Sequence, residues 1–523
     1  MVPEQRRAIA AAALLPYALA IFFGLWSLRG LDSKTPVDTD AARHAMNGVF
    51  LYDVLRHGGT LHVVSFARSY YGQYPSLSMP YHPPLFPAFE ALFYLGLGVN
   101  IVAARLAIAA ATAAAVLLLY GFVLKTHGSH AVAAASAVVA FSLPSSLALA
   151  RDVMLEMPAL ALVLLAMTVL PGLGGDYSLR RGVAFGLAAG AAVWTKQNAV
   201  FLGAVPFVYL ALERRRRALK EPGLWVAAGL FGAIVVALAL FSASFGAAAN
   251  PRWPAFDLLR TLRNNVPYYA AAAAAEVGTV PALLIAAAMV ASLATDRRNA
   301  NAPYLAWAAS VFLVVFLLPP RDQRYLFFAY PALAVVVCSM LYRAAQAALP
   351  REWAWTAPAA LAAIWFAAHA AGYPIYLHGP FEAARLIDPA DHPRVLFCGR
   401  SNGSFIFAVR ARDPELRTTI IRGDKFPESA FSPAGIEKFA HDYGVEYVVL
   451  ERTVLPRAWD ALLKQAPRSF TLIKDVPLTS SDALLNGTLR VFRFAHPSPT
   501  PAGTLELRTL GPHIEADLPR EGR

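Results

Sequence analysis

Long apolar blocks recur along this chain, and they constrain its fold more than any other feature. Each block runs for about 16 to 25 residues rich in Ala, Leu and Val, and a helix needs about 20 such residues to cross the roughly 30 Å hydrocarbon core of a bilayer. Only 15% of the 523 residues are charged, whereas ordinary soluble domains carry roughly 25%. A transmembrane barrel would need short strands of alternating polarity instead. The sequence therefore predicts a polytopic α-helical membrane protein.

The blocks divide into about eleven expected spans. The first span follows Arg6 and Arg7, as a signal peptide would, but its apolar run is long and no small-residue cleavage site clearly ends it, so we expect it to be retained. The apolar segment 85–99 is shorter and contains Glu90, which favours an interfacial or re-entrant helix. We place the spans near residues 8–28, 101–124, 130–149, 157–171, 181–195, 197–212, 223–246, 278–295, 303–319, 325–343 and 353–371.

The net charge of +12 is concentrated in short loops between the apolar blocks, which indicates membrane orientation and not nucleic-acid binding. If the N-terminus is cytoplasmic, every inside loop is basic. We therefore expect a multi-pass protein of the cytoplasmic (inner) membrane, surrounded by membrane lipid, with its N-terminus inside. The basic residues of the inside loops are Arg6, Arg7, Lys125, Arg180, Arg181, the run Arg214 to Arg217, Lys220, Arg297, Arg298, Arg343 and Arg351.

The composition changes sharply after about residue 375. The tail contains the apolar run PRVLFCG, a helix-like stretch near 433–443 and the strand-like VEYVVL at 445–450. We therefore divide the chain into a membrane domain, residues 1–375, and a soluble α/β domain, residues 376–523, outside the membrane. The outer loop 30–100 of the membrane domain is expected to hold interfacial helices.

The first polar cluster follows the first span directly, in the sequence DTDAARHAMNG at 38–48. On a helix, Asp40, His44 and Asn47 share one face because of their spacing. A carboxylate at a membrane surface can serve as a general base that takes a proton from an acceptor hydroxyl. The alternative is structural, since Asp38 or Asp40 would also cap the start of an interfacial helix.

Two further clusters interrupt apolar blocks at outward turns. In RDVMLEMP, Asp152 and Glu156 are four residues apart and are expected to face the same way. They could bind a divalent cation or an arginine, orient a substrate, or simply be solvated among the lipid headgroups. In WTKQN, Lys196 lies between two spans, where it could meet a lipid-linked phosphate or snorkel to the interface.

A fourth cluster is PPRDQRYL at 319–326, where Arg321 and Arg324 are three residues apart beside Tyr325. Arginine offers paired donors to a phosphate. The alternative is an ion pair with Asp322 that orders a short loop. All of these clusters fall on the outward side of the expected topology.

A fifth segment, YHPPLFP, begins with Tyr81 and His82 and contains prolines that fix an extended turn. Both side chains could contact a ligand, although a histidine beside a proline turn is more often structural. The sequence has no P-loop, no GxGxxG after a strand in the membrane half and no HExxH, so nothing indicates an enzyme that consumes a cytosolic nucleotide.

In this order, the segments resemble the GT-C membrane glycosyltransferases that use polyprenyl-phosphate sugars. Among them, the segments resemble especially the bacterial protein O-mannosyltransferase-like and aminoarabinose-transferase-like group. The resemblance covers roughly residues 8–345 and implies a GT-C-like bundle with an outer domain. It rests on DTDAARHAMNG, YHPPLFPAFEALFYLGLGVNIVAARLA, ARDVMLEMPALAL, AVWTKQNAVFLGAVP and RDQRYLFFAYPAL.

The resemblance also implies roles for individual residues. Asp40 matches the catalytic acid of the first outer loop, with Asp38 in reserve, and Glu156 matches the second outer acid. Lys196 and Arg324 match positions that look like contacts to the donor phosphate. Beside Arg324, Arg321 and Tyr325 are further candidates for phosphate binding.

The match departs from the family pattern at two positions. Many relatives have an acidic pair where this chain has Asp40 followed by Ala41, and a lysine where it has His82. The second change removes one permanent positive charge near the expected donor.

We therefore expect a glycosyltransferase of the cell envelope that moves a hexosyl or pentosyl group, with inversion, from an undecaprenyl-phosphate or similar carrier. The acceptor would be an envelope glycan, lipid or protein on the outer face of the membrane, and a divalent cation near Glu156 could assist. One alternative is a multi-span transporter or lipid flippase, which should show internal repeats and helix breaks near the bilayer midplane. Another is a non-catalytic envelope assembly protein.

Overall fold

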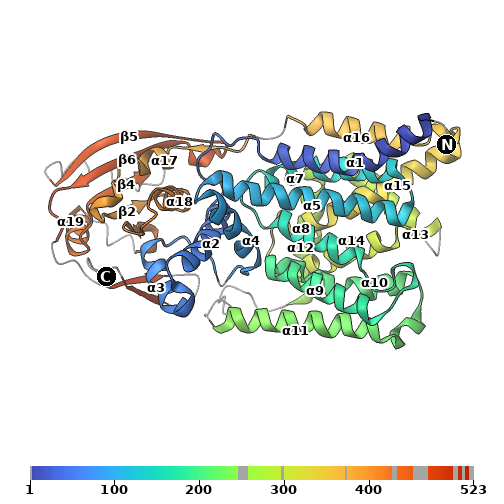
Figure 1. Ribbon diagram of the computed structural model, residues 1–523, viewed down its shortest axis with the longest axis horizontal. Coiled ribbons are helices and arrows are strands. Elements are labelled where there is room, and N and C mark those ends of the chain that lie inside the picture. Colours follow the sequence, from blue (N-terminus) through green and yellow to red (C-terminus); the bar gives the residue numbers. More distant parts are fainter. Residues whose placement is uncertain are drawn as a thin grey trace. The chain divides into compact units, whose positions relative to one another are not determined.

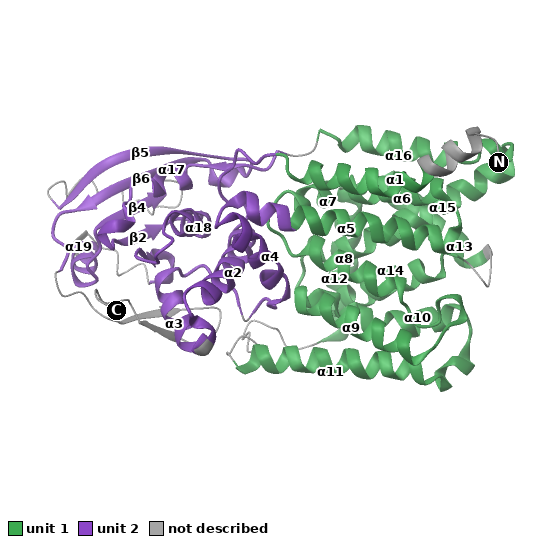
Figure 2. Cartoon of the chain, in the orientation of Figure 1, with its two compact units in different colours: residues 1–29, 108–244, 250–373 green, residues 30–107, 245–249, 374–523 purple. Residues whose placement is uncertain are grey.

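The computed structural model describes residues 3–79, 81–244, 257–295, 300–371, 374–426, 433–451, 469–498, 504–508 and 513–517. Arg297 and Arg298, two of the basic residues used to predict orientation, lie outside the described residues. The chain divides into two compact units (Figure 2). Unit 1 contains residues 1–29, 108–244 and 250–373, and unit 2 contains residues 30–107 and 374–523 together with 245–249, which are not described.

Unit 1 is helical in its described parts, and each predicted span falls on a helix or on two consecutive helical segments (Figure 1). Helix α5 begins in unit 2 and continues into unit 1. The helices are α1 (Pro3–Ser27), α5 (Ile101–His127), α6 (His130–Phe141), α7 (Pro144–Ala150), α8 (Glu156–Thr168), α9 (Leu179–Thr195), α10 (Val205–Leu212), α11 (Pro222–Ser244), α12 (Leu258–Val277), α13 (Thr279–Thr295), α14 (Ala302–Leu317), α15 (Tyr330–Ala348) and α16 (Thr356–His369).

The helices differ in whether they are long enough to cross a membrane. Among the described residues, three stretches are long and apolar enough by themselves, namely α5, α11 and Gln323–Ala348. The bent pairs α6 with α7 and α12 with α13 raise this number to five if each pair is one span. Others are short: the 13 residues of α8 extend only about 20 Å. The count of eleven spans therefore stays a prediction.

Unit 2 combines three helices from the first part of the chain with a sheet from the last part. The helices are α2 (Thr39–Arg56), α3 (Val63–Gln73) and α4 (Leu85–Leu97), so the predicted interfacial segment 85–99 is a helix. A six-stranded mixed sheet has the order β1-β5-β6-β4-β2-β3. Its strands are β1 (Leu377–His378), β2 (Arg394–Cys398), β3 (Thr419–Arg422), β4 (Tyr447–Glu451), β5 (Phe470–Ser480) and β6 (Gly487–Phe494).

Strand β2 lies between β3 and β4 and runs parallel to both, and the other pairs are antiparallel. Helix α18 (Asn402–Arg412) connects β2 to β3, and α19 (Pro433–Asp442) lies between β3 and β4 in the chain, as parallel strands require crossover connections. The short helix α17 (Pro380–Ala384) precedes β2, and β7 (Thr504–Arg508) pairs with β8 (His513–Asp517). The predicted C-terminal α/β fold, with its helix near 433–443 and its strand near 445–450, is confirmed.

The helix α2 packs against α18, although the paired residues Asp53 and Arg410 are 357 positions apart in the chain. Gly403 makes this approach possible, because a Cβ atom there would lie 2.7 Å from the Cβ of Ala42. The Ser404 hydroxyl also donates to the carbonyl of Pro36 at 2.8 Å. The outer loop therefore belongs to the same compact unit as the C-terminal sheet, whereas the sequence predicts two domains divided at residue 375.

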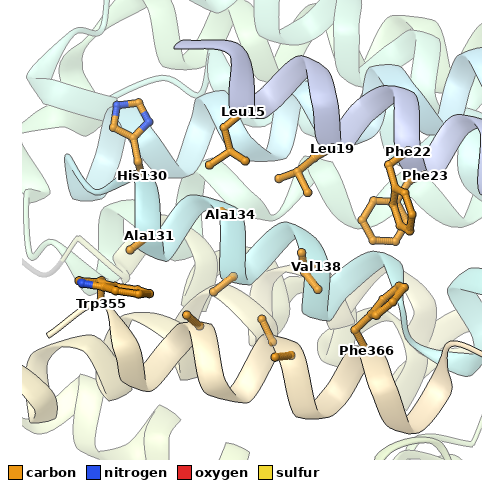
Figure 3. A pocket seen from close by; sticks show the side chains of 14 residues that line it. Leu15, Leu19, Phe22, Phe23, His130, Ala131, Ala134, Val138, Trp355 and Phe366 are labelled. Atoms are coloured by element: carbon orange, nitrogen blue, oxygen red, sulfur yellow. The ribbon is translucent and has the colours of Figure 1, made fainter. Parts of the chain in front are cut away.

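Unit 1 also carries an apolar groove of about 590 Å³ between α1, α6 and α16 (Figure 3). Phe22, Phe23 and Phe366 line one end of the groove, and His130 and Trp355 line the other. The lining is almost entirely hydrocarbon, which suits a lipid chain in a membrane protein.

Candidate active site

The eleven candidate residues divide between the two units. Five of them, Asp38, Asp40, His44, Tyr81 and His82, belong to unit 2. The other six, Asp152, Glu156, Lys196, Arg321, Arg324 and Tyr325, belong to unit 1.

In unit 2, Asp38 and Asp40 have different structural roles at the start of α2. Asp38 is the N-cap, because its carboxylate accepts a hydrogen bond from the backbone N–H of Asp40 at 2.7 Å. Asp40 lies in the first turn, where the helix dipole favours a negative charge. Its side chain is 28% exposed and lies 3.3 Å from Nη1 of Arg43. Asp38 therefore caps the helix, as the structural alternative expected for Asp38 or Asp40, and the carboxylate of Asp40 remains accessible.

The face of α2 that follows Asp40 is buried against the proline turn. The rings of His44 and His82 meet edge to face with centroids 4.6 Å apart, and Tyr81 contacts His82 in the same way at 4.9 Å. The amide of Asn47 donates to the hydroxyl of Ser78 and accepts from its backbone N–H, each at 2.9 Å. The motifs DTDAARHAMNG and YHPPLFP thus form one cluster, and Asn47 fixes the turn that carries His82.

In unit 1, three polar turns meet around the start of α8. Helix α9 ends before Lys196, and the 3-10 helix η3 (Gln197–Gly203) follows it. The PPRDQRY turn leads into the 3-10 helix η5 (Gln323–Ala329). Both η3 and η5 contact α8, and η5 also contacts α7 and α12. The sequence prediction that these turns lie at one end of the helices agrees with this packing.

Glu156 and Lys196 form a buried ion pair. Glu156 is the first residue of α8 and is fully buried, while Lys196 is 7% exposed, and Nζ lies 3.0 Å from Oε1. Lys196 is therefore held by a carboxylate and does not snorkel. The other carboxylate oxygen, Oε2, has no hydrogen-bond partner within the described part of the chain.

Asp152 does not share a helical face with Glu156, because α8 begins only at Glu156. Residues 151–153 form a turn instead, in which the Asp152 carboxylate accepts from the backbone N–H of Val153 at 2.9 Å. Asp152 is nonetheless 4% exposed, so it is not a solvated surface acid. The spacing argument failed because it assumed a helix through a turn.

Arg324 and Arg321 have different surroundings. The Nε and Nη2 atoms of Arg324 lie 2.9 and 2.8 Å from Oδ2 of Asp322, which is the ion pair that the sequence left open as an alternative. Arg321 is exposed and lies 5.5 Å from the ring centroid of Tyr268. Tyr325 follows in η5 and is half-buried, and its backbone N–H donates to the carbonyl of Asp322 at 3.0 Å.

The acids do not build a metal site from protein ligands alone. No group of three or more His, Cys, Asp or Glu side chains suited to a metal ion occurs among the described residues. At Glu156 the ammonium of Lys196 lies 3.0 Å from Oε1 and would repel a divalent cation. The surroundings of Glu156 therefore do not fit the divalent cation that the sequence suggests there.

Sequence reasoning missed several polar residues that surround these groups. Arg43 lies inside the quoted motif, three residues after Asp40, and its spacing could have identified it as a partner. Asp53 is fully buried in unit 2, and no local pattern indicated its partner Arg410. Tyr269, whose hydroxyl accepts from the backbone N–H of Asp322 at 3.4 Å, comes from a segment 53 residues away.

Solved structures share this fold over nearly the whole chain. The structure of ArnT from Cupriavidus metallidurans bound to undecaprenyl phosphate matches with a TM-score of 0.59 and 15% identity, covering 92% of this chain and 97% of that one. The archaeal oligosaccharyltransferase AglB from Archaeoglobus fulgidus, in complex with an inhibitory peptide and a dolichol-phosphate, matches with a TM-score of 0.50 and 13% identity, covering 86% and 70%. The chain has the GT-C fold.

This GT-C assignment agrees with a match at the level of sequence. Residues 81–241 match the family model described as dolichyl-phosphate-mannose-protein mannosyltransferase. No curated protein sequence matches the chain. The resemblance inferred from the ordered motifs is confirmed, and the matched GT-C segment includes His82, Glu156 and Lys196.

Proposed function

We propose that this protein is a membrane glycosyltransferase that transfers a sugar from a polyprenyl-phosphate carrier to an acceptor on the outer face of the cytoplasmic membrane. The observation that carries the proposal is the fold match to ArnT with undecaprenyl phosphate bound, which extends over 97% of that chain. The accessible carboxylate of Asp40 and the cationic turns of unit 1 supply the chemistry such a reaction needs.

In the proposed reaction, Asp40 is the general base. It takes the proton of an acceptor hydroxyl or amine, which attacks the anomeric carbon of the sugar. The new bond to the sugar forms as the bond between that carbon and the phosphate oxygen breaks, and polyprenyl phosphate leaves with the bonding electrons. A single displacement inverts the anomeric centre.

Negative charge grows on the departing phosphate, and we assign its stabilisation to Lys196, Arg321, Arg324 and Tyr325. Lys196 and Arg324 are each held by a carboxylate, from Glu156 and Asp322, so their positions are fixed before the donor binds. Arg321 has no carboxylate within ion-pair distance among the described residues, which leaves its charge available to a phosphate.

The two aspartates of α2 give a matched test of the base. We expect Asp40→Asn to reduce turnover of a polyprenyl-phosphate sugar by about 10²–10⁴-fold, the usual contribution of a general base. Asp38→Asn should retain activity, because asparagine also caps helices well. The activity of both variants is measured as the turnover of a polyprenyl-phosphate sugar by the purified protein in detergent. Wild-type turnover by Asp40→Asn would remove the base assignment, and loss only in Asp38→Asn would move the role to the reserve candidate.

The Glu156 and Lys196 pair gives a test of the phosphate site. Changing either residue alone would leave a buried charge uncompensated, at a cost of about 3–5 kcal/mol in stability. The double variant Glu156→Gln/Lys196→Met removes both charges. We expect it to fold and to lose affinity for the donor, measured as a raised KM. An unchanged KM and kcat in the folded double variant would contradict the assignment.

A further inference from the structure

A buried polar network joins the helix that carries Asp40 to the C-terminal sheet domain. Asp53 near the end of α2 is fully buried, and Arg410 near the end of α18 is 2% exposed. The guanidinium of Arg410 forms a bidentate pair with the carboxylate of Asp53: Nε donates to Oδ2 at 2.8 Å, and Nη2 donates to Oδ1. The remaining nitrogen, Nη1, donates to the backbone carbonyl of Asp413 at 2.8 Å.

Tyr70 of α3 and Tyr74, the residue that caps the end of this helix, extend the network. The hydroxyl of Tyr70 donates to Oδ2 of Asp53 at 2.8 Å, and that of Tyr74 donates to Oδ2 of Asp413 at 2.7 Å. Burial, reinforced by the neighbouring carboxylates, raises the pKa of Tyr70 and of Tyr74 well above the ordinary value, so both remain protonated donors. The Asp413 carboxylate also accepts from the backbone N–H groups of Arg417 and Thr418.

Such a network adds little to the stability of the fold, but it constrains how α2 and α18 are placed relative to each other. A buried ion pair is often no more stable than apolar residues of the same size, because both charges lose their hydration. A bidentate pair between Arg410 and Asp53 nevertheless fixes direction as well as distance. The pair is satisfied in only one arrangement of α2 and α18, whereas apolar contacts would allow one helix to slide along the other.

A second contact between α2 and α18 lies nearer the start of α2. There Gly403 lies against Ala42, two residues after Asp40. On α2 the two contact points are about 16 Å apart along the helix axis. A rigid helix held at two points can neither rotate nor shift along its axis, so α18 determines where the first turn of α2 places its side chains.

We propose that Arg410, through Asp53, is a positioning residue for Asp40. The inference rests on the proposed function, in which Asp40 is the base. It gives the C-terminal domain a direct part in catalysis: the domain holds the general base in register with its substrate and is not only a platform for the acceptor.

The experiment uses the full-length protein and a double variant, Asp53→Asn/Arg410→Met, which removes both charges at once. Its matched control is Asp475→Asn/Arg490→Met, which removes an ion pair of 3.2 Å whose side chains are 44% and 27% exposed, in the same domain. We expect the double variant to melt near the wild-type temperature, to keep its donor KM and to lose about 10- to 100-fold in kcat, as a displacement of about 1 Å in a reacting group produces. The control should keep its kcat.

A conservative variant keeps the test decisive if the double variant fails to fold. Arg410→Lys retains the charge but loses the bidentate geometry. A lowered kcat in folded Arg410→Lys with unchanged KM supports positioning, and a wild-type kcat in either folded variant overturns it.

Failure of the inference differs from failure of the proposed function. If Asp40→Asn is inactive while the Asp53/Arg410 variants keep a wild-type kcat, positioning by Arg410 is wrong and the base stands. If Asp40→Asn is fully active, the base assignment falls and the inference falls with it.

Discussion

At the residue scale, the most unusual group outside the proposed chemistry is Glu90 on α4, a helix that we do not count as a span. It is fully buried, and its Oε1 accepts from the hydroxyl of Tyr94 at 2.9 Å. Its Oε2 has no hydrogen-bond partner within the described residues and lies 2.3 Å from where a Cβ at Gly48 would be. Burial raises the pKa of Glu90 well above its ordinary value, although the Tyr94 hydroxyl opposes this.

This raised pKa predicts a stability that falls as the pH rises. In the unfolded chain Glu90 ionises above about pH 4.5, whereas in the folded protein it stays protonated to higher pH, so each step upward favours the unfolded state. We expect Glu90→Gln to be more stable than wild type at pH 8, with the difference vanishing near pH 4. Thermal unfolding in detergent across this range measures it, with the exposed Glu352→Gln as control. A difference in stability between Glu90→Gln and wild type that does not change with pH would contradict the raised pKa of Glu90.

At the element scale, the position of Lys196 depends on how α9 packs. Three glycines spaced four residues apart, Gly182, Gly186 and Gly190, form the face of α9 that meets α11. A Cβ at Gly182 would lie 2.1 Å from the carbonyl oxygen of Gly223, and one at Gly190 would lie 2.5 Å from the side chain of Ile234. Small residues of this kind let helices in a membrane approach closely.

The glycine face gives a prediction with an internal control. We expect Gly182→Ala to destabilise the protein by about 1–3 kcal/mol, because the backbone of α11 must move away. Gly229→Ala in α11, where a Cβ would meet nothing within 4 Å, should instead be neutral or stabilising by up to about 1 kcal/mol through helix propensity. The two melting temperatures in one detergent decide the matter, and equal values would show that the close approach is not needed.

The elements also show what sequence could and could not predict. Apolar length located the helices of unit 1 other than α12, because it depends on neighbouring residues. Ordered motifs located the turns that carry Lys196 and Arg324. The ion pairs depend on partners far away in the chain: Asp53 and Arg410 are separated by 357 positions, and no local pattern connects them. For the same reason, the sequence did not indicate that the outer loop and the C-terminal domain form one compact unit.

At the scale of the whole molecule, unit 2 restricts the membrane topology. Residues 30–107 and 374–523 form one compact body, so both must lie on the same side of the membrane. The chain between them must therefore cross an even number of times, which the predicted topology with its odd total satisfies. This argument uses packing alone and is independent of loop charge.

Labelling with a membrane-impermeant thiol reagent tests this topology. In a cysteine-free background, Val64→Cys and Leu484→Cys place exposed thiols in the two segments of unit 2. We expect both to react from the outside of intact cells, whereas Leu219→Cys beside the Arg214 to Arg217 run should react only after lysis. Opposite reactivity of the first two would show that the segments do not share a side, and reversed reactivity of all three would invert the orientation.

The shared unit has a consequence for synthesis of the protein. Between residues 107 and 374 lie 266 residues, so at roughly 5–20 residues per second the ribosome needs roughly 15 to 50 s to reach the second segment after finishing the first. During that delay α2 can pack on α3 and α4, and Asp53 can pair with Tyr70, but Arg410 and Gly403 of α18 have not yet been translated. Newly made chains thus pass through a stage at which the face of α2 that meets α18 is uncovered and open to chaperones and proteases on that side of the membrane.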